Sequence, residues 1–147
     1  MNPMIMRFLV LAAMALATLS MQTRARAETL TDHDVRMMQA VISSQLAALA
    51  QDDADRAFAT ATPAVREQIG SPARFLALVR GHYPMVYRHQ AASFLKPEVD
   101  DGKVIQLVQL RDDNDKTWLV LFAMERQPDA SWRIGSCLVA ETRWQAV

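Results

Sequence analysis

The apolar residues change period near residue 90, and this change constrains the fold more than any other feature of the chain. Over residues 35–49 they recur three or four positions apart, as on one face of a helix. After residue 90, β-rich segments follow one another at 91–99, 103–111, 117–126 and 132–141. Helices followed by a run of strands are typical of an α+β domain.

Capping residues mark the helix boundaries of the first half. Thr31 followed by Asp34 resembles a capping box with the shorter acid, and it begins a long helix that is expected to end near residue 51. Further starts are predicted where an N-cap residue or a hydroxyl residue with proline occurs, at Asp52-Asp53, Thr62-Pro63 and Ser71-Pro72. The last two helices are expected to end at Gly70 and Gly81, because glycine favours the position just past a helix end.

Polar turns separate the strands of the second half. They are Asp101-Gly102, residues 112–116 and residues 127–131, and Asp-Gly is the strongest hairpin signal of the three. The sequence therefore predicts a curved, antiparallel, four-stranded meander with the N-terminal helices packed on one face. A short extra strand is predicted at residues 85–88.

The central strands are apolar on both sides. Every residue from Trp118 to Met124 is apolar, whereas an antiparallel sheet with one wet face alternates apolar and polar residues. Since the helices cover one face, we expect a second copy of the chain on the other, in a two-fold dimer that buries on the order of 800 Å² per partner. The expected interface residues are Ile105, Leu107, Leu119 and Leu121. The alternative is a sheet that curls enough to bury itself.

The N-terminus has the layout of a secretory signal. Arg7 precedes an apolar run from Phe8 to Leu19, and Ala25-Arg26-Ala27 matches an Ala-x-Ala cleavage site. The run is shorter than the roughly 20 residues that span a bilayer. An uncleaved amphipathic arm is the alternative interpretation.

Two segments follow from this interpretation. We expect a signal peptide at residues 1–27 and a single α+β domain at 28–147, with translation starting at Met1, Met4 or Met6. The expected location is periplasmic or secreted, without a stable membrane anchor after cleavage.

Charge and cysteine content exclude several classes of partner. Cleavage after Ala27 removes three arginines, which leaves 13 basic and 16 acidic residues. Nucleic acid is therefore not expected as a partner, because phosphate binding needs a basic excess. The single cysteine, Cys137, cannot close an internal disulfide and is expected to be a buried, inert thiol.

The segment GHYPMVYRH at residues 81–89 concentrates side chains that bind or react. His82, Tyr83, Tyr87 and His89 are candidates for the rim of a ligand pocket, since a tyrosine has an apolar body and a polar tip. A structural corner held by tyrosine hydroxyls is the alternative. Acid–base catalysis by the same four residues is a third interpretation.

No carboxylate falls in the middle of a predicted strand, so no catalytic residue is assigned. The aspartates of the turns are expected to be solvated, at Asp100, Asp101, Asp112, Asp113, Asp115 and Asp129. Residues 112–116 begin like a calcium loop but have lysine at the fifth position and no glycine at the sixth. We expect no metal and no cofactor.

Three phrases carry a resemblance to a known family: SPARFLALVRGHYPMVYR, QLVQLRDDNDKTWLVLF and ERQPDASWRIGSCLV. Over residues 35–140 the chain resembles an uncharacterised bacterial exported family, domain of unknown function 4864. Its layout is also similar to the nuclear transport factor 2-like or cystatin-like superfamily. The resemblance implies helices lying in a cone of curved sheet, but no known activity. Ala130 departs from the glycine expected in that turn, which concerns turn geometry.

These observations favour a non-catalytic binding or interaction module with an apolar interior. Its expected partners are a second copy of the chain, a small apolar ligand or an envelope protein. The alternative is a small isomerase, dehydratase or hydrolase that uses the His82, Tyr83, Tyr87 and His89 group.

Overall fold

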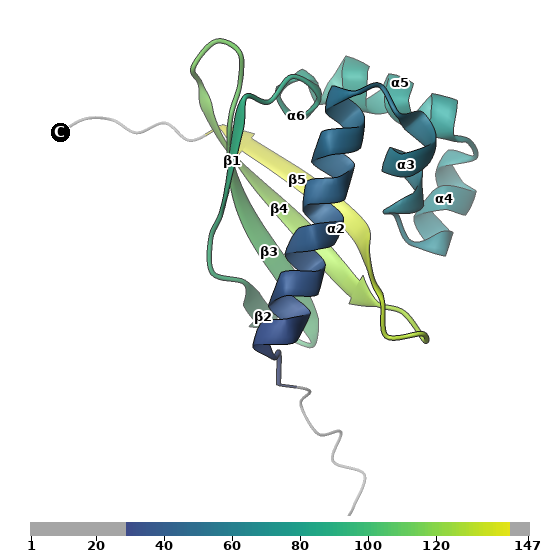
Figure 1. Cartoon of the computed structure of the whole chain (residues 1–147), viewed down its shortest axis with the longest axis vertical. Coiled ribbons are helices and arrows are strands. Elements are labelled where there is room, and N and C mark those ends of the chain that lie inside the picture. The colour runs from purple at the N-terminus through teal and green to yellow at the C-terminus, as the bar shows by residue number, and fades with distance from the viewer. Residues whose placement is uncertain (1–28, 142–147) are drawn as a thin grey trace, which may run out of the picture.

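The computed structural model describes residues 29–141. The expected signal peptide at 1–27 lies outside these residues, as does the segment 142–147. The helices are α2 (Asp32–Ala50), α3 (Ala54–Ala59), α4 (Pro63–Ile69), α5 (Pro72–His82) and α6 (Pro84–Tyr87). The strands are β1 (Ala91–Phe94), β2 (Glu98–Asp100), β3 (Lys103–Arg111), β4 (Thr117–Arg126) and β5 (Trp132–Glu141). The predicted α+β class is confirmed, and Figure 1 shows the helices grouped on one side of the sheet.

The predicted helix starts are confirmed. The backbone N–H of Asp34 donates to the Thr31 hydroxyl, and that of Thr31 donates to the Asp34 carboxylate, so both halves of the capping box form. N-caps with side-chain hydrogen bonds also begin the next three helices, at Asp53, Thr62 and Ser71. Helix α5 runs past Gly81 to His82, so the predicted end at Arg80 was short by two residues.

The predicted strand at residues 85–88 is wrong. Residues 84–87 form the single helical turn α6, with Pro84 at its first position. Proline fixes φ near the helical value and lacks the N–H that a helix start leaves unpaired, so this turn follows α5 directly.

The sheet has five strands instead of four. Its order is β1-β3-β4-β5, and β2 pairs with the same edge of β3 as β1 does. The predicted single strand over 91–99 is broken between Phe94 and Glu98, where Pro97 has no N–H to give to a sheet ladder. The other three strands begin and end at the predicted residues.

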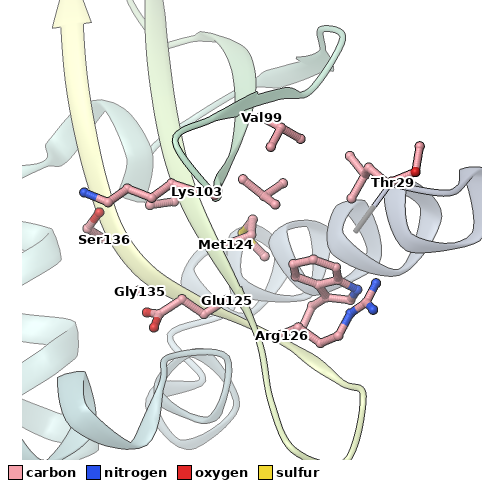
Figure 2. A pocket seen from close by; sticks show the side chains of 13 residues that line it. Thr29, Val99, Lys103, Met124, Glu125, Arg126, Gly135 and Ser136 are labelled. Carbon is pink, nitrogen blue, oxygen red and sulfur yellow. The ribbon is translucent and has the colours of Figure 1, made fainter. Parts of the chain in front are cut away.

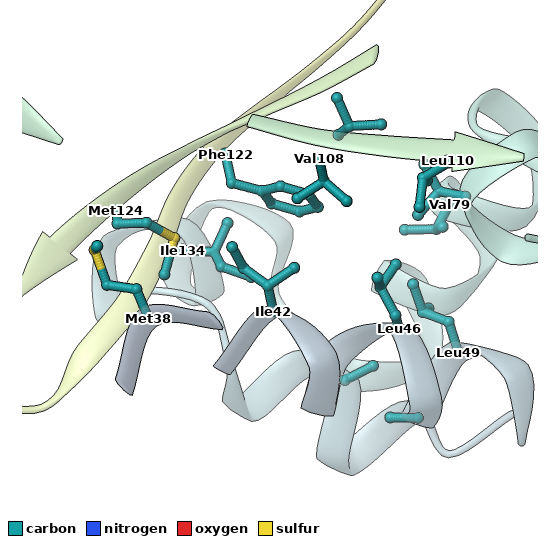
Figure 3. Close-up of a cluster of buried hydrophobic side chains, with 14 of the residues drawn as sticks. Met38, Ile42, Leu46, Leu49, Val79, Val108, Leu110, Phe122, Met124 and Ile134 are labelled. Atoms are coloured by element: carbon teal, nitrogen blue, oxygen red, sulfur yellow. The ribbon is translucent and has the colours of Figure 1, made fainter. Parts of the chain in front are cut away.

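One face of the sheet packs against α2 to form the core. Figure 3 shows Met38, Ile42, Leu46 and Leu49 of α2 directed at the sheet. They meet strand side chains that are wholly buried, at Val108, Leu110, Val120 and Phe122. The long helix therefore crosses the sheet, packing on the side chains of β3 and β4 and lying close to β5.

The link between α3 and α4 pairs with the beginning of β5, at one edge of the sheet. Ala61 bridges in parallel to Ile134 of β5, through hydrogen bonds from Thr62 to Ile134 and from Ile134 to Thr60. This contact fixes the small helices α3–α5 beside β5 and leaves a space between them.

Candidate functional site

A cavity of about 190 Å³ lies between β5 and helices α2, α4 and α5. Val65 and Ile69 of α4 and Phe75 and Val79 of α5 form the helical walls. The strand wall comes from residues 134–137 at the beginning of β5. The small helices create this space because α4 contributes no fully buried residue and does not seal against the strand.

The cavity lining carries no charged side chain. The polar residues at its wall are Gln45, Tyr83, Ser136 and Cys137. The Gln45 amide donates to the Thr60 hydroxyl at 3.1 Å, so one of its two N–H donors is already used within the protein. Burial raises the pKa of the Cys137 thiol to about 12, which keeps it protonated near neutral pH. The cavity is suited to an apolar guest.

Only one of the four candidate residues of segment 81–89 lines this cavity. Tyr83 does so from the link between α5 and α6, where the residue is 40 % exposed, and it therefore lies at the rim. His82 is exposed at the end of α5. The structure thus separates the residues that the sequence groups together.

Tyr87 points to a different place, the C-terminal end of α2. Its hydroxyl donates to the carboxylate of Asp52, and Arg80 donates to the same oxygen at 3.1 Å. The Arg80 guanidinium also lies 5.2 Å from the centre of the Tyr87 ring. The Tyr87 hydroxyl, followed by Arg80, lowers the pKa of Asp52 below its ordinary value. This cluster ties α2, α5 and α6 together.

His89 is held locally. Its Nδ1 lies 2.8 Å from the backbone carbonyl oxygen of Val86, one turn back along the chain. The contact fixes the ring at the end of α6, where the chain enters β1.

A second hollow is a groove of about 670 Å³ at the end of the sheet where α2 begins. Figure 2 shows Val99, Met124 and Arg126 on the side of α2, whereas Glu125 and Ser136 lie on the other side of the strands. Neighbouring residues of a strand point to opposite faces, so this groove wraps around the sheet end and is not a single chamber.

Two aspartates are more constrained than the sequence suggested. Asp34 is buried and pairs with Arg126, and its pKa is lowered to about 2 by hydrogen bonds from Thr31 and by the arginine. Asp112, predicted to be solvated, is buried at 6 % exposure, so that prediction was wrong. Its carboxylate accepts hydrogen bonds from the Trp118 indole and from two backbone N–H groups of the turn, which lower its pKa. Both acids stabilise the fold.

Metal ligands do not cluster in the described part of the chain. Residues 29–141 contain no group of three or more histidine, cysteine, aspartate or glutamate side chains placed to hold an ion. In the same range, no helix is long and apolar enough to span a membrane.

The four predicted interface residues lie side by side on the face of the sheet that the helices leave uncovered. Leu107 is directly opposite Leu121, and Leu119 and Ile105 lie in the rows on either side. All four are half-buried in the single chain.

Sequence reasoning named Tyr83 but missed the rest of the cavity lining. The available signal was the apolar pair Val65 and Ile69, four positions apart on one face of α4. This spacing does not reveal that the apolar face of α4 lines a cavity instead of packing into the core.

Comparison with known proteins gives one match. Searches of curated proteins and of solved structures each find none. A family model described as a domain of unknown function, DUF4864, matches residues 31–147, which includes the capping threonine of α2, the helices and the whole sheet. The chain is therefore a member of the DUF4864 family.

Proposed function

We propose that the domain is a non-catalytic binding module that takes a small apolar molecule into the cavity between β5, α4 and α5. The observation that carries this proposal is the uncharged and mostly aliphatic lining of that cavity. An apolar cavity of about 150 Å³ accommodates a molecule of the size of benzene. Drug-sized ligands need roughly 300 Å³ or more, so the guest is a small molecule or one apolar group of a larger one.

The distribution of the histidines and tyrosines supports a non-catalytic role. Acid–base chemistry needs a carboxylate or imidazole within hydrogen-bond reach of the substrate. Among the described residues that line the cavity there is neither, and Tyr83 is its only tyrosine. Tyr87 is engaged with Asp52. An isomerase, dehydratase or hydrolase site is the rival hypothesis.

The proposal includes the exported location and the superfamily that the sequence suggests. We infer that residues 1–27 direct export to the periplasm or the medium of a bacterium. The placement of helices on one face of the sheet supports a nuclear transport factor 2-like or cystatin-like fold. Fractionation of expressing cells, with N-terminal sequencing of the exported product, tests the location: a chain that keeps its N-terminal segment in the cytoplasm contradicts it.

Fluorobenzene is a suitable probe of the cavity, because its fluorine resonance reports binding directly. We expect the purified protein to broaden and shift this resonance in a saturable way. The variant Val65→Phe places a ring into the cavity from α4, and we expect it to abolish saturation while the protein remains folded.

A matched control adds the same ring elsewhere. Met37 of α2 is 43 % exposed and does not line the cavity, so Met37→Phe is expected to bind fluorobenzene like the original chain. His82→Ala and His89→Ala are also expected to leave binding unchanged. An unsaturable signal from the original chain, or equal binding by folded Val65→Phe, would falsify the ligand proposal.

A further inference from the structure

The uncovered face of the sheet carries a row of leucines that crosses four segments. Leu107 of β3 is directly opposite Leu121 of β4, which is opposite Leu138 of β5. Leu95 extends this row beyond β3, since its N–H donates to the carbonyl of Leu107 at 3.0 Å. The leucine row thus consists of Leu95, Leu107, Leu121 and Leu138. Its two ends are open to solvent, since Leu95 is 41 % and Leu138 67 % exposed.

The rows on either side of the leucine row carry a charge only at one outer end, where Glu98 of β2 lies opposite Ile105. One holds Ile105, Ala123 and Ser136, and the other holds Gln109, Leu119 and Ala140. The other charged side chains on this face, for example Arg111 and Glu125, lie beyond these rows. The centre of the face is therefore a continuous apolar surface, which monomeric soluble proteins rarely expose.

We propose that two copies of this chain pack these faces against each other, leucine row against leucine row, in a two-fold dimer. Interfaces between identical subunits are more apolar than transient interfaces, which resemble the ordinary surface in polarity. A charge-free centre therefore favours an interface between identical subunits. Two sheets stack about 10 Å apart with their inner side chains interdigitated, which is a geometry that a row of leucines permits.

The size of the face agrees with this occupant. Nine residues of strand extend for about 30 Å and four strands are about 19 Å wide, which gives on the order of 600 Å² before side-chain relief is added. A standard interface buries about 800 Å² per partner. The face is thus of the right size for one partner of similar dimensions.

Sedimentation equilibrium of the purified chain tests the proposal, at protein concentrations from about 1 to about 100 μM. We expect a dimer. The decisive variants are Leu138→Glu and Leu95→Glu, at the two exposed ends of the leucine row, where a change does not disturb the monomer core. Each is expected to raise the dimer dissociation constant at least ~100-fold, since a carboxylate that is buried without a partner in an apolar interface is costly.

The control is Leu78→Glu, which places the same charge on an exposed leucine of α5, within the helical layer. It is expected to leave the dimer intact. A monomer at 100 μM, or a dimer broken by Leu78→Glu and not by the row variants, overturns the proposal.

A second arrangement is distinguishable by the same variants. Beyond Ile134 the outer edge of β5 has no strand partner within residues 29–141, and two copies can pair there edge to edge. Such a dimer would be weakened by Leu138→Glu but not by Leu95→Glu, which lies at the opposite edge of the sheet. That result would also overturn face-to-face packing. Fluorobenzene binding reports on the cavity and is independent of these outcomes.

Discussion

The carboxylate of Asp34, in the first turn of α2, accepts a hydrogen bond from the guanidinium of Arg126, 92 residues further along the chain at the end of β4. Arg126 also lies 4.9 Å from the centre of the Trp132 ring at the start of β5. One carboxylate therefore caps the long helix and fixes the helix to the sheet, at the end of the molecule opposite to the Tyr87 cluster.

Asp34→Asn is predicted to make stability less dependent on pH in the acid range. The folded-state pKa of Asp34 is about 2, below its ordinary value of 3.8, so the carboxylate contributes stability above pH 4 that is lost as pH falls through 2. We expect the variant to lose on the order of 1 to 2 kcal/mol at neutral pH, with partial exposure of Arg126 limiting the effect.

Urea unfolding of both proteins between pH 2 and 7 measures this difference. It should shrink towards zero at the acid end. Asp32→Asn, an exposed change in the same turn, controls for the loss of one charge near the helix start. A difference that stays constant down to pH 2 would show that the ionised carboxylate is not the cause.

Gln106→Leu is predicted to destabilise the fold although it makes the core more apolar. Gln106 is wholly buried on the core face of β3, and its amide donates to the carbonyls of Leu95 and Leu107 at 2.7 and 2.9 Å. The Leu95 carbonyl lies at the break between β1 and β2, so the side chain replaces a missing sheet hydrogen bond.

Leaving that buried carbonyl unpaired is expected to cost about 1 to 3 kcal/mol in unfolding free energy. Urea denaturation measures it. The matched control Gln109→Leu, three positions along on the opposite face, lacks such a partner and should not lower stability. Equal effects of the two substitutions would sink this account of Gln106.

Local signals predicted most of the fold. The capping box of Thr31 and the turns that bound β3, β4 and β5 depend on neighbours within a few residues, and they were correct. The errors arose where distant contacts decide. Residues 84–87 are too few for the spacing of their apolar positions to distinguish a turn of helix from a strand. Their conformation also depends on the bond from Tyr87 to Asp52, 35 residues away in the chain.

The candidate site was predicted only in part, for the same reason. The sequence named Tyr83 and Tyr87 together, but the turn at Pro84 directs one to the cavity and the other to Asp52. Burial of Asp112 depends on the indole of Trp118 from the next strand, which no local pattern reveals. The uncovered sheet face, by contrast, was visible as two-sided apolar strands.

Tyr87→Phe is predicted to lower the melting temperature by a few degrees, because it removes the hydroxyl that connects α6 to Asp52. Fluorobenzene affinity should not change, since Tyr87 does not line the cavity. Thermal unfolding and the fluorine titration together measure the two effects. Tyr83→Phe is the control, because Tyr83 lines the cavity and has no bond to Asp52. It should leave the melting temperature nearly unchanged. A binding loss in Tyr87→Phe without a thermal shift would contradict this role.

Cys137 is predicted to react slowly with an aromatic disulfide reagent at pH 8. The thiolate is the reactive form, and a pKa of about 12 leaves little of it. The native rate should be at least ~1000-fold below that of the unfolded chain, whose thiol titrates near 8.5. Absorbance of the released aromatic thiolate, recorded with and without denaturant, gives both rates. Comparable rates in the two states would mean that the thiol is accessible and ionised in the native fold.

Ala130→Gly is predicted to stabilise the protein. Ala130 has a φ of +67° in the turn between β4 and β5, where its N–H donates to the Gln127 carbonyl at 2.9 Å. A side chain in this left-handed conformation costs about 1 to 2 kcal/mol, and glycine avoids that cost. Part of the gain is offset because glycine loses more freedom on folding, so we expect a net increase of up to about 1 kcal/mol in unfolding free energy.

Ala140→Gly, in the exposed end of β5, has no such conformation to relieve and should destabilise instead. Urea denaturation of the two variants should thus give opposite signs, and a loss of stability in Ala130→Gly would rule out backbone strain at this turn.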